Sequence, residues 1–187
     1  MSTDEKIKVE RDYWLSHQAG LLQDYLDRCQ SPIERLFLMS LLNSGWDLGC
    51  GAGSYYEWER DVWRIPSIAA ARKARSFSPC FHNDDGNGTS KGALQLPIVV
   101  DGRSFRLDFA IFVFDTRVAI ELDGHEFHEK TKEQARKEKS RQRLLTADGW
   151  HVLRFTGSEV YGDAQACVFE AINTAEKLQF SALGSSR

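Results

Sequence analysis

The chain has 187 residues, with 24 Lys or Arg against 27 Asp or Glu, and a formal net charge of −3. This length suffices for one domain with a substantial core, and the net charge excludes a global attraction to nucleic acid, so that any such attraction must be local. Scattered cysteines, a polar N-terminus and the absence of a long apolar run favour a cytoplasmic protein with free thiols and no membrane segment.

The first part of the chain is expected to be helical. Residues 11–28 have the spacing of an amphipathic helix, and we expect residues 1–30 to form an N-terminal helical extension. A second helix should run from Ser31 to about Leu42, because Ser31, Pro32 and Glu34 have the order of a capping box. Capping alone is therefore one explanation of Glu34.

Residues 44–92 are rich in glycine, serine and aromatic residues, and residues 83–88 are predicted to be a loop. Residues 47–53 (DLGCGAG) look like the glycine-rich motif of S-adenosylmethionine-dependent methyltransferases, whose glycines let the backbone approach a nucleotide. Such a motif should follow a strand and open a helix, but the preceding segment is better explained as the capped helix. A glycine loop without a ligand is the favoured interpretation, and a methyltransferase is a less favoured alternative.

Residues 93–123 are predicted to form three antiparallel strands. Asp101-Gly102 indicates a two-residue hairpin turn, which places Gln95 opposite Asp108. Pro97 cannot donate to a neighbouring strand, so we expect the first strand to lie at an edge of the sheet. In this register one face collects a set of apolar side chains: Leu96, Ile98, Val100, Phe105, Leu107, Phe109, Ile111, Val113, Val118, Ile120 and Leu122.

Carboxylates gather at one end of the second hairpin. A turn about Asp115-Thr116 would place Asp108 opposite Asp123, with Glu121 on the same side. Taken singly, each acid could be a solvated group at a strand end. Together they would repel one another unless a cation lies between them, and hard oxygen ligands favour Mg²⁺ or Mn²⁺. Asp108, Glu121 and Asp123 are therefore the candidate metal ligands.

The remainder should alternate between helix and strand. We expect a helix from Glu126 to Ala147, a strand over residues 150–155 that is reached by a right-handed crossover, a closing helix over about 163–178 and a disordered tail at 181–187. The first of these helices is rich in basic residues, which could bind phosphates or form a solvated face with ion pairs. The candidates for nucleic-acid binding are Lys132, Arg136, Lys139, Arg141 and Arg143.

Two histidines, His125 and His128, directly follow the acids. A histidine there could orient water, transfer a proton or contact phosphate, and His128 is the favoured candidate; the alternative is a residue that faces solvent. A zinc site built from Cys80, His82 and these two histidines is a further alternative with weak spacing.

Several fragments occur in an order and spacing that resemble a known family: Ser31-Pro-Ile-Glu34, Leu94-Gln95-Leu-Pro-Ile98, Arg106-Leu-Asp108-Phe, Ile120-Glu121-Leu-Asp123-Gly-His-Glu-Phe-His128, Glu138-Lys-Ser-Arg141 with Leu145 and Gly149-Trp150, and Val152-Leu-Arg154-Phe155. From about residue 31 to residue 172 the chain is similar to the very-short-patch-repair-like nucleases, a branch of the restriction-endonuclease-like PD-(D/E)XK superfamily. The superfamily signature has an Asp on one strand and (Asp/Glu)-x-Lys on the next. Asp108 and Glu121 take the first two places, but Asp123 stands where Lys is usual. It is open which residue replaces that Lys.

The resemblance implies a three-layer α/β fold, with a mixed sheet flanked by helices, for a nuclease domain at about 31–180. It implies a metal-dependent endonuclease that hydrolyses DNA phosphodiester bonds, with DNA as partner and without a small-molecule cofactor; the oligomeric state is open. Asp108 and Glu121 would bind Mg²⁺ with Asp123 beside them, Glu34 would be a helix-borne acid near the metal, and Gln95 would hold the attacking water or a ligand carboxylate. The alternative is a non-catalytic nucleic-acid-binding module on a nuclease fold.

Overall fold

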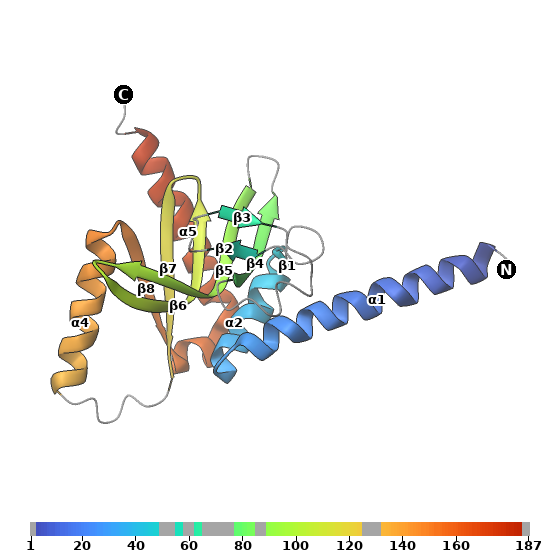
Figure 1. Ribbon diagram of the computed structural model, residues 1–187, viewed down its shortest axis with the longest axis horizontal. Helices are drawn as coiled ribbons and strands as arrows, with labels where there is room; N and C mark the ends of the chain where they lie inside the picture. The colour runs from blue at the N-terminus through green and yellow to red at the C-terminus, as the bar shows by residue number, and fades with distance from the viewer. Residues whose placement is uncertain are drawn as a thin grey trace.

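The structure is a computed structural model that describes residues 3–48, 55–57, 62–64, 77–84, 89–124 and 132–184. Its helices are α1 (Thr3–Arg28), α2 (Pro32–Asn43), α4 (Lys132–Ala147) and α5 (Gly157–Gly184). Its strands are β1 (Asp47–Leu48), β2 (Tyr55–Glu57), β3 (Val62–Arg64), β4 (Phe77–Asp84), β5 (Thr89–Val100), β6 (Arg103–Val113), β7 (Thr116–Asp123) and β8 (Trp150–Thr156). Helix α1 extends away from the rest of the molecule (Figure 1).

The sheet has the strand order β3-β2-β4-β5-β6-β7-β8, and β1 pairs with β4. Neighbouring strands from β4 to β7 are antiparallel, whereas β8 is parallel to β7 because α4 connects the two. Helices α2 and α5 pack on one face of the sheet and α4 packs on the other (Figure 1). The predicted three-layer α/β fold with a mixed sheet is therefore confirmed.

Each face of the sheet has its own hydrophobic cluster. The larger cluster lies between the sheet and helices α1, α2 and α5, and it includes the fully buried Tyr25, Phe37 and Phe109. The smaller cluster lies between the sheet and α4 and includes Leu145 and Trp150. Removal of this apolar surface from water is the main force that holds α2 and α4 against opposite faces of the sheet.

The helix of the predicted N-terminal extension is longer than expected and contributes to the core. Helix α1 begins at Thr3 rather than near residue 11, and its final turns bury Leu21 and Tyr25 in the larger cluster. None of the described helices is long and apolar enough to cross a membrane.

The ends of the last two helices also differ from the prediction. Helix α4 is described from Lys132 onward, and residues 125–131, where its start was predicted, lie outside the described residues. Helix α5 begins at Gly157, is interrupted at Asp163 and continues to Gly184, so that residues 181–184 are helical rather than part of a disordered tail. Residues 185–187 lie outside the described residues.

The first hairpin has the predicted turn and register but not the predicted place in the sheet. Asp101 and Gly102 both have positive φ, as a two-residue turn requires. Strand β5 is not an edge strand, because β4 pairs with it from Thr89 to Ala93. Pro97 lies beyond this pairing, toward the hairpin turn, so its missing N–H removes no hydrogen bond to β4.

The second hairpin turns one residue earlier than predicted. Its turn is Phe114–Asp115, and Val113 pairs with Thr116. Phe114 has a φ of 50°, which bulky residues rarely adopt. The buried Thr116 hydroxyl donates to Gln179 Oε1 of α5 at 2.9 Å. In the predicted turn Thr116 would leave the strand, so this contact favours the observed turn.

The change of turn alters which carboxylates face each other. Phe109 pairs with Ile120, and continuation of this register by one residue places Asp108 opposite Glu121 rather than opposite Asp123. A displacement by two residues keeps every side chain on its own face of the sheet. However, the pairs of β6 with β7 end at Phe109 and Ile120, and the residues on either side of Asp108 belong to clusters on opposite faces, so the regular alternation breaks at Asp108. A shared face for Asp108 and Glu121 therefore stays a prediction.

The predicted single apolar face is divided between the two clusters. The smaller cluster takes Leu96, Ile98, Val100, Phe105 and Leu107, and the larger one takes Phe109, Ile111, Val113, Val118, Ile120 and Leu122. The division falls at Gln95, whose φ of 54° interrupts the regular alternation of side chains along β5, and at Asp108 in the facing position of β6. The outer part of this hairpin thus packs toward α4.

The segment at residues 44–92 contains short strands that the sequence did not predict. Asn83 and Asp84 belong to β4 rather than to the loop predicted at 83–88. Asp47 and Leu48 of the glycine motif form β1, and residues 49–53 lie outside the described residues. The next described element is strand β2, whereas a nucleotide-binding motif should open a helix. The described residues therefore do not support the methyltransferase alternative.

Candidate active site

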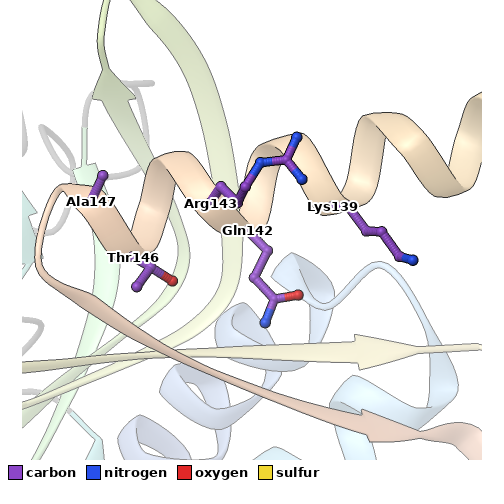
Figure 2. Close-up of a pocket in the computed structure, with 5 residues that line it drawn as sticks. All are labelled: Lys139, Gln142, Arg143, Thr146 and Ala147. Carbon is purple, nitrogen blue, oxygen red and sulfur yellow. The ribbon is translucent and has the colours of Figure 1, made fainter.

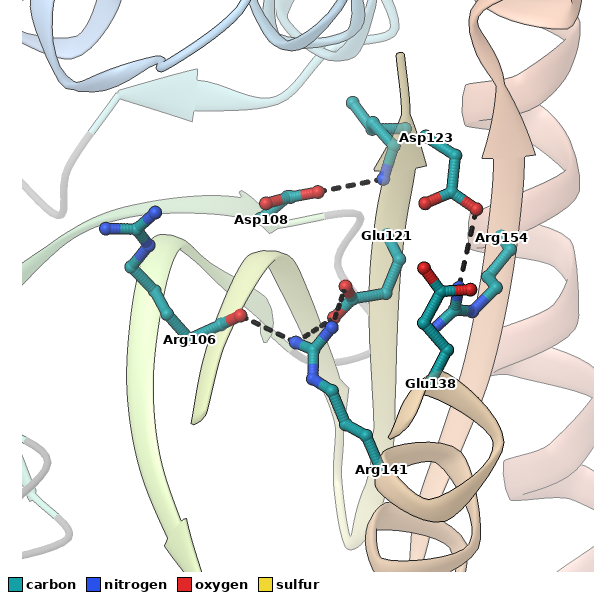
Figure 3. Close-up of polar contacts among 8 residues, drawn as sticks. Arg106, Asp108, Glu121, Asp123, Glu138, Arg141 and Arg154 are labelled. Atoms are coloured by element: carbon teal, nitrogen blue, oxygen red, sulfur yellow. Dashed lines mark hydrogen bonds and ion pairs between the residues drawn. The ribbon is translucent and has the colours of Figure 1, made fainter. Parts of the chain in front are cut away.

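Asp108 on β6 lies beside the end of β7. Its Oδ2 accepts a hydrogen bond from the backbone N–H of Leu122 at 2.8 Å (Figure 3). Burial raises the pKa of Asp108 from its ordinary value of 3.8 to about 7. The bond from Leu122 lowers this pKa, and the nearby carboxylates of Glu121 and Glu34 raise it. A carboxylate with such a pKa bears a charge that its surroundings do not balance, which makes it a candidate to bind a cation.

Glu121 on β7 faces helix α4, where Arg141 holds both of its oxygen atoms. Arg141 donates from Nη1 to Oε2 at 2.6 Å and from Nη2 to Oε1 at 2.8 Å, and Nη2 also donates to the carbonyl of Arg106 at 2.7 Å (Figure 3). The Glu121 side chain is 7% exposed. Burial raises the pKa of Glu121, and the guanidinium of Arg141 lowers it. The charge of this buried carboxylate is thus balanced by a cation of the chain itself.

Asp123, two residues further along β7, is bound to a different cation. Arg154 on β8 donates from Nη1 to Asp123 Oδ2 at 3.4 Å, and the same nitrogen lies 3.9 Å from Glu138 Oε2 on α4 (Figure 3). The parallel pairing of β7 with β8 places Arg154 beside Glu121. A second arginine therefore neutralises acids at this end of the sheet.

Contrary to the prediction, the three carboxylates do not converge on one point. Within the described ranges, no group of three or more His, Cys, Asp or Glu side chains is placed to hold a metal ion. The shifted register moves Asp123 away from its predicted place opposite Asp108, and arginines hold both Asp123 and Glu121. Asp108 and Glu121 remain the pair whose oxygen atoms have the chemistry that Mg²⁺ prefers.

Glu34 combines a capping role with a link to the sheet. Its N–H donates to Ser31 Oγ at 3.3 Å, which confirms Ser31 as the cap. Its carboxylate accepts from the Ser31 hydroxyl and from the Gln30 N–H, each at 2.9 Å, so the reciprocal bond of the predicted capping box goes to the residue before the N-cap. Gln95 donates from Nε2 to Glu34 Oε2 at 2.7 Å. The carboxylate that Gln95 holds is therefore that of Glu34, a buried acid close enough to Asp108 to raise its pKa.

The two roles of Glu34 can be separated by Glu34→Gln. The amide oxygen can still accept from Gln30 and Gln95, and the amide nitrogen can donate to Ser31. The free energy of unfolding should therefore change by less than about 1 kcal/mol, the scale of one cap. Loss of the charge beside Asp108 should lower the rate of DNA cleavage by at least about tenfold. Urea unfolding and initial cleavage rates measure the two effects.

The matched control is Glu159→Gln, because Glu159 forms the same kind of box with Thr156 at the start of α5. This exposed box should tolerate the change without loss of cleavage. If Glu34→Gln cleaves as fast as the unaltered chain, Glu34 acts in capping alone.

The basic residues of α4 lie on two sides of the helix. Lys132, Arg136, Lys139 and Arg143 are exposed and share one face, because they are spaced three or four apart. Arg141 lies about half a turn around the helix from that face and contacts Glu121. The predicted group of five is thus divided into an exposed basic face, formed by the other four, and a single inward arginine.

A shallow pocket lies along the C-terminal part of α4 (Figure 2). The pocket has a volume of about 460 Å³ and is lined by Lys139, Gln142, Arg143, Thr146 and Ala147. Both of its cations, Lys139 and Arg143, belong to the exposed basic face, and Gln142 and Thr146 can donate hydrogen bonds. The pocket is thus chemically suited to a phosphate of a nucleic-acid backbone.

The histidine predictions fall on residues 125–131, outside the described residues, so the role of His128 stays a prediction. The same holds for the zinc alternative, since the side chains of Cys80 and His82 are not described either. Sequence reasoning missed Arg154 as a site residue. An arginine between Leu153 and Phe155 in an apolar strand was the available signal, because such a group requires an acidic partner.

The part of the chain that carries most of this site matches a known family. Residues 94–174 match the family REase_MTES_1575, which is restriction-endonuclease-like. The matched segment contains Gln95, Asp108, Glu121, Arg141 and Arg154 but not Glu34. No curated protein and no solved structure matches the chain significantly. The family match supports the PD-(D/E)XK superfamily and the restriction-endonuclease-like type of the fold, and it points to a nuclease.

Proposed function

We propose that the chain is a metal-dependent endonuclease that hydrolyses phosphodiester bonds of DNA. The observation that carries this proposal is the pair of acids Asp108 and Glu121, which lie on neighbouring strands, close enough for the charge of Glu121 to raise the pKa of Asp108, within the segment that matches a restriction-endonuclease-like family. Buried acids whose pKa values are raised are typical of functional sites. Within the superfamily we favour the very-short-patch-repair-like branch, because Asp123 stands where Lys is usual.

Asp108 and Glu121 would hold Mg²⁺, for which Mn²⁺ could substitute. The donor chemistry fits, since both groups are hard carboxylates and the negative charge of Asp108 is poorly balanced. When bound, the ion would supply activation of a water molecule and neutralisation of charge on the phosphate. Asp123 would act beside these ligands by holding Arg154 next to Glu121.

Other side chains would set the charge and the position of the groups around the metal ion. Gln95 keeps Glu34 in place, and the charge of Glu34 near Asp108 favours a cation there. His128 stays a candidate to orient water or to contact the phosphate. The exposed basic face lies on the side of α4 away from Glu121, so it would bind flanking phosphates rather than the one that is cleaved.

This role of the exposed basic face predicts a change in salt dependence. Changing Lys132, Arg136, Lys139 and Arg143 together to Ala should weaken DNA binding evenly across sequences. The slope of log affinity against log salt should become shallower by roughly one unit for each lost contact. Binding titrations over a range of salt concentrations measure this slope. Cleavage at saturating DNA should largely survive, because Asp108 and Glu121 are untouched.

The matched control for salt dependence is Lys137→Ala. Lys137 lies on the same helix but is paired with Glu133 at 2.9 Å, so its loss tests the effect of helix charge alone. It should leave the slope nearly unchanged. An unchanged affinity and slope in the fourfold variant would show that the exposed basic face is only a solvated surface, and that DNA binds elsewhere.

A panel of labelled duplex DNA, single-stranded DNA and RNA tests the proposed activity. We expect cleavage of DNA with Mg²⁺ or Mn²⁺ and no cleavage with a chelator. The competing possibility is a nucleic-acid-binding module without catalysis, which the missing Lys favours. That module would bind members of the panel with or without metal and would cut none of them.

A further inference from the structure

Arg141 is bound to the acid that the proposed metal ion would need. Its guanidinium engages both oxygens of Glu121, at 2.6 and 2.8 Å, and also bonds to the Arg106 carbonyl at 2.7 Å. The ring of Phe105 lies 5.8 Å from the guanidinium carbon. Arg141 is 23% exposed and Glu121 is 7% exposed, so water weakens this pair only in part.

A divalent cation and this guanidinium are in conflict over one carboxylate. Two cations on a buried group repel each other strongly, because the local dielectric is lower than that of water. An ammonium group could relieve such a conflict by losing a proton, but a guanidinium stays charged in proteins. A metal ion should therefore bind Glu121 more weakly for as long as Arg141 holds both of its oxygens.

We propose, resting on the function proposed above, that Arg141 competes with the divalent metal ion for the Glu121 carboxylate and thereby sets the metal affinity of the site. Arg141 is in this sense a positioning residue that balances the charge of Glu121 before the metal arrives. Its contacts with the Arg106 carbonyl and the Phe105 ring do not depend on Glu121. They keep the released guanidinium close to the site, where it is a cation available to the phosphate.

Calorimetric titration with Mn²⁺ tests the competition directly. The titrations use about pH 8, where Asp108, with its pKa of about 7, is ionised. Arg141→Gln should bind Mn²⁺ at least about tenfold more tightly than the unaltered chain, a change of about 1.4 kcal/mol. Lys137→Gln is the control, because it removes one positive charge from the same side of the same helix, one turn before Arg141, at a position that is exposed and paired with Glu133. It should leave Mn²⁺ affinity within about twofold.

A purely structural role for Arg141 predicts the opposite sign. Loss of a structural arginine would loosen the site, and Mn²⁺ would then bind more weakly. Equal or weaker binding by Arg141→Gln overturns the proposal.

Arg141→Gln leaves Glu121 buried without its cation and could prevent folding. Arg141→Lys is therefore tested as well. Lys keeps the charge but presents a single ammonium in place of the two-pronged contact. Mn²⁺ should bind Arg141→Lys more tightly than the unaltered chain, though less tightly than Arg141→Gln. If only Arg141→Lys folds and its affinity is unchanged or weaker, the proposal is overturned.

The outcomes separate this proposal from the proposed function. Tighter Mn²⁺ binding by the Arg141 variants in a chain that cuts no DNA supports the competition and contradicts the nuclease. DNA cleavage by a chain whose Arg141 variants bind Mn²⁺ no more tightly supports the nuclease and overturns the competition. Absence of Mn²⁺ binding in all of the proteins also overturns the competition.

Discussion

Asp108→Asn should abolish DNA cleavage and, at the same time, stabilise the metal-free protein above pH 7. Cleavage should fall by more than about a hundredfold, because even partners outside a ligand set are worth 10- to 100-fold. The Asn oxygen can still accept the hydrogen bond from Leu122, so the local backbone should keep its geometry. Steady-state cleavage and urea unfolding of the same preparation measure both effects.

The gain in stability follows from the raised pKa of Asp108. The folded protein holds this proton up to about pH 7, whereas the unfolded chain releases it near pH 3.8. Stability contributed by the protonated group is complete below pH 3.8 and is lost as the pH rises through 7. The neutral Asn escapes this loss, so its advantage should reach roughly 2 to 4 kcal/mol at pH 8 and shrink steadily toward pH 4.

Asp115→Asn is the matched control, since Asp115 is an exposed acid in the turn of the hairpin that carries Asp108. It should alter neither cleavage nor the pH dependence of stability. A destabilised Asp108→Asn at pH 8 would show that the surroundings of Asp108 favour its charged form, which contradicts a carboxylate whose pKa is raised by burial.

Glu121→Gln should also abolish cleavage, but it should destabilise the protein. Burial raises the pKa of Glu121 and would by itself favour a neutral side chain there. The amide of Gln, however, would turn its own N–H donors toward one guanidinium nitrogen of Arg141, and Arg141 would lose its balancing charge while it stays bound to the Arg106 carbonyl; we expect this loss to dominate. Loss of one partner of a buried ion pair costs about 3–5 kcal/mol, and the partial exposure of Arg141 should reduce this to about 2–3 kcal/mol. Urea unfolding measures the cost, and the cleavage assay measures the activity.

Glu133→Gln is the control for an ion pair on the same helix that is exposed to water. Glu133 and Lys137 are 75% and 74% exposed, so this change should cost less than about 0.5 kcal/mol.

Asp108 and Glu121, the two acids of the proposed metal site, should thus be equally necessary for cleavage, but their substitutions should have opposite effects on the free energy of unfolding. Equal stability of Asp108→Asn and Glu121→Gln would contradict this difference.

The acids of the site could be found from the sequence because an acid within an apolar strand is conspicuous. Their proximity on neighbouring strands could be predicted even though the register was displaced by two residues, because the charge of Glu121 does reach Asp108. The direction of their side chains could not, because the alternation along β6 breaks at Asp108. The register itself depended on Phe114 in a left-handed conformation and on a contact between Thr116 and Gln179 of α5. No local pattern reports such a long-range contact.

The partners of the acids were harder to predict. The sequence alone could have predicted that Arg141 faces the opposite side of α4 from Lys132 and Arg136, because helical spacing fixes their relative directions. The pairing of Asp123 with Arg154 requires the register of two parallel strands joined by a helix, which local sequence does not specify. The central place of β5 also depended on β4, a strand in a segment without a clear pattern.

The most direct test of the central claim compares the unaltered chain with Asp108→Asn on labelled duplex DNA, with Mn²⁺ or with a chelator. Both proteins should be purified side by side, so that a contaminating nuclease would act equally in both. We expect cleavage by the unaltered chain with Mn²⁺ alone, no cleavage by Asp108→Asn under either condition, and DNA binding by both proteins. Equal cleavage by the two proteins, or cleavage by the unaltered chain in the presence of the chelator, would contradict a metal-dependent nuclease centred on Asp108.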